Sequence, residues 1–276
     1  MKLSDASKFF DRTPALDVAT GRVLFRCQID PYDDSKRDAA PAYRRIMSVA
    51  PGTAMPASRV VKALGKTWII GNMEPDGLSE LHREKYVVHM ATDSLKVSTL
   101  SGFLAGTVAS TVMASPSWVK DAKQLEVSSE TPQIFDITLP KGSGVLARQI
   151  LWTTDYAYLV LSNRPMASGL EVASALWLSQ PLPLVGSLVA QVYDPVPGIY
   201  SAPAPTNVNM VKVRWQSLFE YGSQMSERFQ EGDWAIVMPV GTVTSTSTKL
   251  TLEGINYQVL AVMDMAGAVV AHARKA

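Results

Sequence analysis

A short β-hairpin pattern occurs twice in this sequence, as VVKALGKTWII at residues 60–70 and as KLTLEGINYQV at residues 249–259. At a constant offset the apolar positions and the turn glycine coincide, and Trp68 matches Tyr257. Each copy is typical of a strand, a tight turn with glycine, and a second strand that opens with an aromatic residue. Small β-barrels are built from such hairpins. The pattern therefore predicts one small barrel around each copy.

Further strands are predicted on both sides of the two hairpins. Residues 23–29, 43–49 and 85–91 accompany the first copy, and residues 208–215 and 234–238 accompany the second. Alternating apolar and polar residues are typical of half-buried strands. The segments around the first copy are enough for one small barrel.

The expected fold class is mainly β, with two small β-barrel modules joined by a further β-rich region and few helices. Residues 1–95 are expected to form an N-terminal barrel module with an N-terminal arm, and residues 206–276 a C-terminal barrel module. Residues 96–205 are expected to form a less regular β-rich middle region. This region ends in DPVPGIYSAPAPT at residues 194–206, which is typical of a proline-rich linker.

The composition argues against a dedicated nucleic-acid binder. Lys and Arg number 26 against 25 Asp and Glu, without the basic excess expected of such proteins. Charged residues make up 18% of the chain, below the roughly 25% of ordinary domains. A low fraction of charged residues indicates either that part of the surface is hidden in an assembly or that the chain is an ordinary β-rich domain, and both interpretations stay open. The single cysteine, Cys27, excludes an intramolecular disulfide framework.

No segment suggests membrane insertion. Residues 1–8 lack the apolar core of a signal peptide. The longest weakly polar stretch, residues 98–118, is interrupted by serine, threonine and proline, whereas a spanning helix needs about 20 mostly apolar residues.

Two fragments resemble catalytic motifs but are incomplete. Gly65-Lys66-Thr67 matches the end of a phosphate-binding loop, but Val60 stands where that loop needs glycine. His82-Arg83-Glu84 matches part of a zinc deaminase motif, which also needs a cysteine pair. We therefore predict no catalytic, cofactor-binding or metal-binding residues and no enzymatic activity. An enzyme site assembled from scattered carboxylates is the remaining alternative.

Five residues are candidates for an interface. Four basic residues would form a rim on one side of the first barrel, facing phosphate or acidic loops of a partner, although a solvated face is the simpler explanation. The four are Arg44, Arg45, Arg59 and Lys62. The fifth, Trp118, follows Ser115-Pro116-Ser117 and would be an exposed anchor at an interface.

The second barrel region resembles a known class of viral proteins. Gly232-Asp233, followed by Trp234-Ala235-Ile236-Val237 and then LEGINYQVL at residues 252–260, resembles the small barrels of tailed-bacteriophage neck and tail proteins. Residues 59–71 resemble them too. In that family such barrels are head-completion (stopper) or connector proteins below the portal. The middle region departs from the pattern, because simple stoppers have a single domain.

The resemblance implies a non-enzymatic virion structural protein at the head–tail interface, in the neck, connector or upper tail. It implies a homo-oligomeric ring of about six or twelve copies around the DNA channel. Its partners would be portal, adaptor and tail proteins, with non-specific contact to packaged DNA and no cofactor or membrane. The protein would be made in the bacterial host cytoplasm and end in the virion. Exposed edge strands would join subunits by extending each other's sheets. The alternative is a ligand- or glycan-binding β module of a tail fibre or tail tip.

Overall fold

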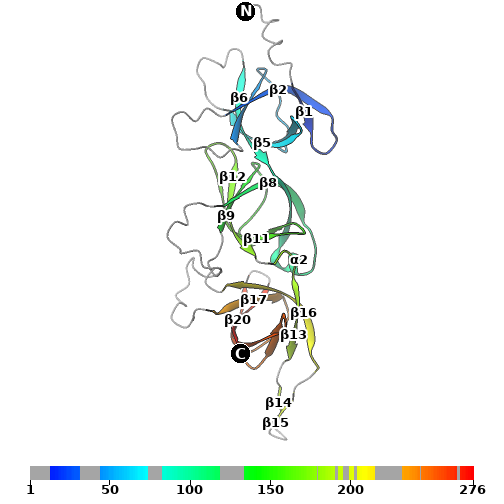
Figure 1. Ribbon diagram of the computed structural model, residues 1–276, viewed down its shortest axis with the longest axis vertical. Helices are drawn as coiled ribbons and strands as arrows, with labels where there is room; N and C mark the ends of the chain where they lie inside the picture. The colour runs from blue at the N-terminus through cyan, green and yellow to red at the C-terminus, as the bar shows by residue number, and fades with distance from the viewer. Residues whose placement is uncertain are drawn as a thin grey trace, which may run out of the picture.

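The described part of the chain forms three closed barrels of six antiparallel strands each, stacked into an elongated column (Figure 1). The computed structural model describes residues 13–31, 44–73, 83–118, 134–178, 180–189, 192–194, 199–201, 204–214, 232–242, 244–265 and 268–276. The expected mainly-β class with small barrel modules is confirmed. The expected N-terminal arm lies largely outside the described residues, which begin at Thr13.

Barrel 1 lies at the N-terminal end of the column. Its strands are β1 (Thr13–Asp17), β2 (Val23–Pro31), β3 (Arg44–Val49), β4 (Val60–Ala63), β5 (Lys66–Met73) and β6 (Glu84–Ala91). They close in the order β1-β2-β3-β6-β5-β4. The predicted hairpin at residues 60–70 is β4 and the start of β5, with Trp68 buried in the barrel core.

Barrel 2 is formed by the region that we expected to be less regular. Its strands are β7 (Asp93–Thr99), β8 (Ser110–Trp118), β9 (Ile134–Leu139), β10 (Gln149–Trp152), β11 (Ala157–Pro165) and β12 (Glu171–Leu178). A short helix, α2 (Leu100–Leu104), follows β7. The middle region is therefore largely a complete third barrel module between the two expected ones.

Barrel 3 lies at the C-terminal end. Its strands are β13 (Leu184–Val189), β16 (Thr206–Arg214), β17 (Trp234–Pro239), β18 (Lys249–Leu252), β19 (Ile255–Met265) and β20 (Ala268–Lys275). The connection between β13 and β16 contains β14 (Val192–Asp194) and β15 (Ile199–Ser201). These two strands form a separate two-stranded sheet. The proline-rich segment at 194–206 therefore lies within barrel 3 and does not link two domains, because β13 precedes it.

All three barrels share one topology. Numbered within each barrel, the strands close in the order 1-2-3-6-5-4 every time. The strand 4–5 hairpin recurs in the middle copy, where Leu151 pairs with Tyr158 as Val61 pairs with Trp68 and Leu250 with Tyr257. These aromatic side chains are all buried. The described part of the chain is thus a tandem array of three copies of one module.

The middle copy escapes the sequence pattern because of its turn. Leu64 and Gly65 in barrel 1, like Glu253 and Gly254 in barrel 3, have φ between 53° and 74°. Turn positions with such a left-handed backbone favour glycine. Barrel 2 turns through residues 154–155 without a glycine, so the most visible mark of the repeat is missing there.

Closure removes the edges on which the expected subunit joints depended. Within the described residues every strand of the three barrels has two hydrogen-bonded neighbours. The expectation of exposed edge strands is therefore wrong for these barrels, because a closed barrel has no edge. The two-stranded sheet β14–β15 does not close. None of the described helices is long and apolar enough to span a membrane.

Candidate functional site

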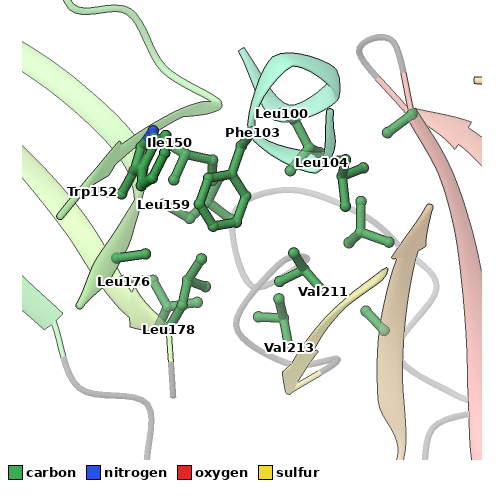
Figure 2. Close-up of a cluster of buried hydrophobic side chains, with 14 of the residues drawn as sticks. Leu100, Phe103, Leu104, Ile150, Trp152, Leu159, Leu176, Leu178, Val211 and Val213 are labelled. Atoms are coloured by element: carbon green, nitrogen blue, oxygen red, sulfur yellow. The ribbon is translucent and has the colours of Figure 1, made fainter. Parts of the chain in front are cut away.

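The densest cluster of buried side chains lies between barrels 2 and 3, and we call this contact the second junction (Figure 2). Helix α2 supplies its centre with three buried residues, Leu100, Phe103 and Leu104. The Phe103 ring meets the Trp152 ring edge-on, with 5.4 Å between centroids. Residues from the outer faces of both barrels complete the cluster: Ile150, Ala157, Leu159, Leu176 and Leu178 of barrel 2, and Val211, Val213, Ala235, Val237, Ala268 and Val270 of barrel 3.

Local sequence explains why α2 forms at this point. The Thr99 side-chain oxygen accepts a hydrogen bond from the Gly102 backbone N–H at 3.0 Å, so it caps the first turn of the helix. At the other end, the Leu104 carbonyl accepts a hydrogen bond from the Asn209 side chain of barrel 3 at 2.9 Å. The helix is therefore held by its own cap and by the neighbouring barrel.

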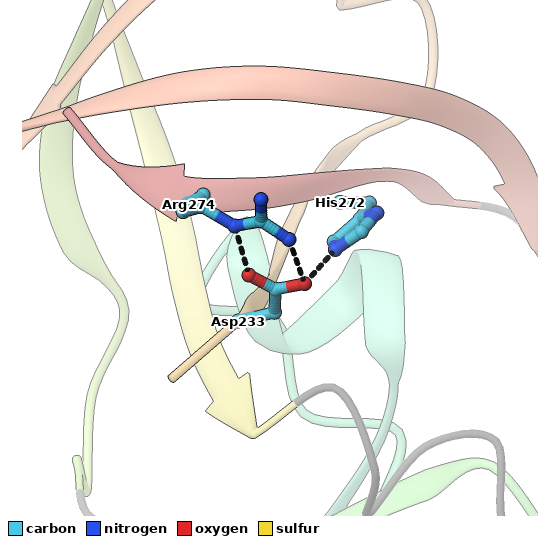
Figure 3. Close-up of polar contacts among 3 residues, drawn as sticks. All are labelled: Asp233, His272 and Arg274. Atoms are coloured by element: carbon cyan, nitrogen blue, oxygen red, sulfur yellow. Dashed lines mark hydrogen bonds and ion pairs between the residues drawn. The ribbon is translucent and has the colours of Figure 1, made fainter. Parts of the chain in front are cut away.

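A charged cluster lies beside this apolar contact and consists of Asp233, His272 and Arg274 (Figure 3). Arg274 donates to both oxygens of the Asp233 carboxylate, from Nε at 2.7 Å and from Nη2 at 2.9 Å. His272 Nε2 lies 2.7 Å from the Asp233 carboxylate. Asp233 precedes β17, and the other two residues lie two apart on β20. They therefore share the sheet face that carries Val270 toward barrel 2.

The charges of this cluster are well matched. The side chains of Asp233 and His272 are only 1% and 4% exposed. A buried carboxylate needs a cation and hydrogen-bond donors to offset its lost hydration, and a bidentate guanidinium supplies both. The hydrogen bonds to Asp233 raise the pKa of Arg274 above its ordinary value.

The geometry of the cluster suits a structural role better than a catalytic one. An aspartate that orients a histidine is also part of many catalytic bases. Such a base must reach the group that it deprotonates, whereas His272 is almost wholly covered in this structure. Among the described residues, no group of three or more His, Cys, Asp or Glu side chains could hold a metal ion.

Barrels 1 and 2 meet at a smaller contact, which we call the first junction. Its apolar part consists of Ile69, Ala91 and Leu170, with Met113 packed against them. The β11–β12 loop approaches β5 so closely that the Asn72 backbone N–H donates to the Ser168 carbonyl. A Cβ on Gly169 would lie 2.0 Å from the Asn72 side chain. Glycine is therefore required at this contact.

One aromatic group in barrel 2 combines the buried Tyr158 with partly exposed residues. Phe135, Tyr156 and Tyr158 pack with centroids 5.2 and 5.5 Å apart, and Trp177 pairs with Tyr158 and is 37% exposed. Burial and the neighbouring Asp93 carboxylate, to which the Tyr156 hydroxyl donates, raise the pKa of Tyr156. Burial, followed by the same carboxylate, raises the pKa of Tyr158 to about 12.

The structure does not gather the four predicted basic residues on one face. Arg44 and Arg45 are consecutive on β3 and so point to opposite sides of the sheet. Strands β6 and β5 separate β3 from β4, which carries the exposed Lys62. Arg59 precedes β4, with φ of 52° and its Nη1 3.5 Å from the Gly71 carbonyl.

The fifth predicted interface residue, Trp118, is the last residue of β8, where it pairs with Phe135. The residues before it belong to the same strand, and Ser115 is buried. The Trp118 side chain lies outside the described part of the chain.

Sequence reasoning missed Asp233, His272 and Arg274 as a group. Their one visible signal is the spacing of His272 and Arg274, which places both on one face of a strand. The third member lies 39 residues away from His272 in the sequence, so only the pairing of β17 with β20 brings it near.

Comparison with known proteins adds no relative: no family model, curated protein or solved structure matches this chain.

Proposed function

We propose that the protein is a non-enzymatic virion structural protein of a tailed bacteriophage, acting at the head–tail interface as a neck, connector or upper-tail component. In this role several copies form a ring around the DNA channel and contact portal, adaptor and tail proteins. The observation that carries the proposal is the tandem stack of three like barrels. A column of this kind spans distance between neighbours without needing an active site.

The polar groups of the second junction support the same view. Asp233, His272 and Arg274 of barrel 3 are engaged with one another beside the contact between barrels. Trp152 Nε1 donates to Ser98 Oγ at 3.0 Å beside them in the same junction. Each of these hydrogen bonds lies within one barrel, so side chains that could do chemistry serve the structure instead, as expected of an assembly protein.

Native mass spectrometry tests this proposal, with the full chain alone and mixed with purified phage portal complex. A ring of defined stoichiometry, or a monomer that joins the portal complex, is the expected result. A stable monomer that ignores both portal and tail proteins would contradict the proposed role.

A second candidate function is glycan binding at Trp177 of barrel 2. The partial exposure of Trp177, beside the aromatic group of Phe135, Tyr156 and Tyr158, favours it, because sugar rings stack on amphipathic aromatic surfaces. Glycan-array binding that disappears in Trp177→Ala, and survives in the control Leu146→Ala, would support this role. Absence of binding by the unmodified chain would reject it.

A further inference from the structure

The β14–β15 hairpin differs from every other described sheet, because its two outer edges are not closed by neighbouring strands. Its register places Val192 opposite Ser201, Tyr193 opposite Tyr200 and Asp194 opposite Ile199. An edge strand presents backbone N–H and C=O groups to any strand that can pair with it. A hairpin of two strands is also only marginally stable by itself in water. Both facts favour the addition of a further strand.

The position of the hairpin in the repeat also favours a contact with a neighbouring element. It connects the first and second strands of barrel 3. The same connection in barrel 2 contains α2, which packs against β16 and β17 of the next barrel. In Figure 1 the hairpin extends beyond barrel 3, at the end of the column. The element that reaches the next barrel from barrel 2 thus has a counterpart that extends beyond barrel 3.

The rim that carries the hairpin also exposes an apolar residue. Strands β13 and β17 run in the same direction, so the hairpin after β13 and Val240 after β17 lie at one end of barrel 3. Val240 is 67% exposed. Pro51 and Lys141 occupy the same place after the third strand of the other two barrels. A single exposed apolar residue is common on protein surfaces, so the inference rests on the open edges and the position of the hairpin.

We propose that the hairpins of neighbouring copies pair edge to edge, with β14 of one copy beside β15 of the next. The inference rests on the proposed ring for the presence of neighbouring copies, and it adds the element that joins them. Because the described barrels are closed, the complementary edge comes from another copy's hairpin. Since one hairpin has two different edges, it can serve a neighbour on each side, and a ring of hairpins closes into one shared sheet without a free edge.

Replacing the hairpin tests this joint in the full chain. Residues 190–203 are exchanged for residues 18–22, which make the same connection in barrel 1. We expect the native mass to fall from the oligomer to the monomer, while the circular dichroism spectrum stays that of a folded β protein. Leu64→Ser, at an exposed turn of barrel 1, is the matched control and should keep the oligomer. An exchanged variant that keeps its oligomeric mass overturns the inference and leaves the proposed ring intact.

Cross-linking distinguishes the possible partners of the hairpin. Val192→Cys and Ser201→Cys mark opposite edges at the same level, and the natural Cys27 is buried, with its thiol pKa raised to about 11 by burial. Mixing the two variants with a short bismaleimide should give mixed dimers in excess over like pairs. Excess like pairs, no dimers, or cross-links only to an added portal protein would each overturn the proposed pairing. A wild-type monomer that still binds portal would also reject it without rejecting the assembly role.

Discussion

The two junctions join the same kind of barrel by different physical means. The second junction buries helix α2 and a broad apolar cluster between barrels 2 and 3, and adds the charged group of Asp233, His272 and Arg274. The first junction buries a few apolar side chains and depends on close backbone approach at Gly169. Only Thr92 separates β6 of barrel 1 from β7 of barrel 2.

This difference shows which features a repeated module can vary. The barrel interiors keep an aromatic residue at one position, as Trp68, Tyr158 and Tyr257 show. The outer faces and connecting loops, by contrast, change from copy to copy. The first junction depends on close backbone approach and the second on buried apolar area. Substitutions at the two junctions should therefore lower stability by different mechanisms.

The largest expected effect is at the centre of the second junction. Phe103 is 1% exposed and packs edge-on against Trp152. Phe103→Ala should lower the free energy of unfolding by about 3–5 kcal/mol, because it removes buried apolar surface and leaves a cavity. Urea denaturation measures the loss. Leu146→Ala, at a side chain that is 64% exposed, is the control and should change stability little.

Removing the carboxylate of the charged cluster should have the next largest effect. Asp233→Ala leaves His272 and Arg274 without their shared acceptor at a buried site. The expected loss in the free energy of unfolding is about 3 kcal/mol, since breaking a buried ion pair leaves an uncompensated charge. Thermal and urea unfolding measure it. Wild-type stability in this variant would show that the cluster does not stabilise barrel 3.

The first junction should respond to a single methyl group. Gly169 has φ of 72°, and its added Cβ would meet Asn72. Gly144 has φ of 70° and no atom within 4 Å of such a Cβ. Both alanine substitutions carry a left-handed backbone penalty of about 1–2 kcal/mol, so the excess loss in Gly169→Ala reports the contact between barrels. Equal losses in the two variants would mean that the close approach contributes nothing.

The smallest expected effect separates the stability of barrel 2 from that of its junctions. Burial raises the pKa of Glu171, but hydrogen bonds from Ser143, Asn163 and Gly142 outweigh it and leave the pKa lowered. This contribution is present above the unfolded-state pKa of about 4.3 and is lost as the pH falls through the lower folded-state pKa. Glu171→Gln should therefore flatten the fall in stability with acidification below about pH 5. Asp155→Asn, at an exposed turn, is the control. If stability falls with acidification in Glu171→Gln as steeply as in the wild type, the expectation is contradicted.

The sequence was sufficient to predict the mainly-β class and a barrel module around each of the two hairpins, because strand alternation and glycine turns are local signals. It predicted two barrels and missed the third, since residues 154–155 make the equivalent turn without glycine. The charged cluster was missed for a different reason. Asp233 meets His272 only through the pairing of two strands that are distant in sequence, and a lone aspartate or histidine carries no sign of that contact.

The strand order that all three barrels share also means that each module adds a fixed length to the array. Going around the ring 1-2-3-6-5-4 in either direction, the last strand lies three places from the first, so the chain crosses the full width of each barrel. Because neighbouring strands are antiparallel, the first strand begins and the last strand ends at the same rim. Each added copy therefore extends the array by one barrel width without disturbing the copies before it. Duplication of one module therefore lengthens such a protein in fixed steps, and the described part of this chain spans three of them.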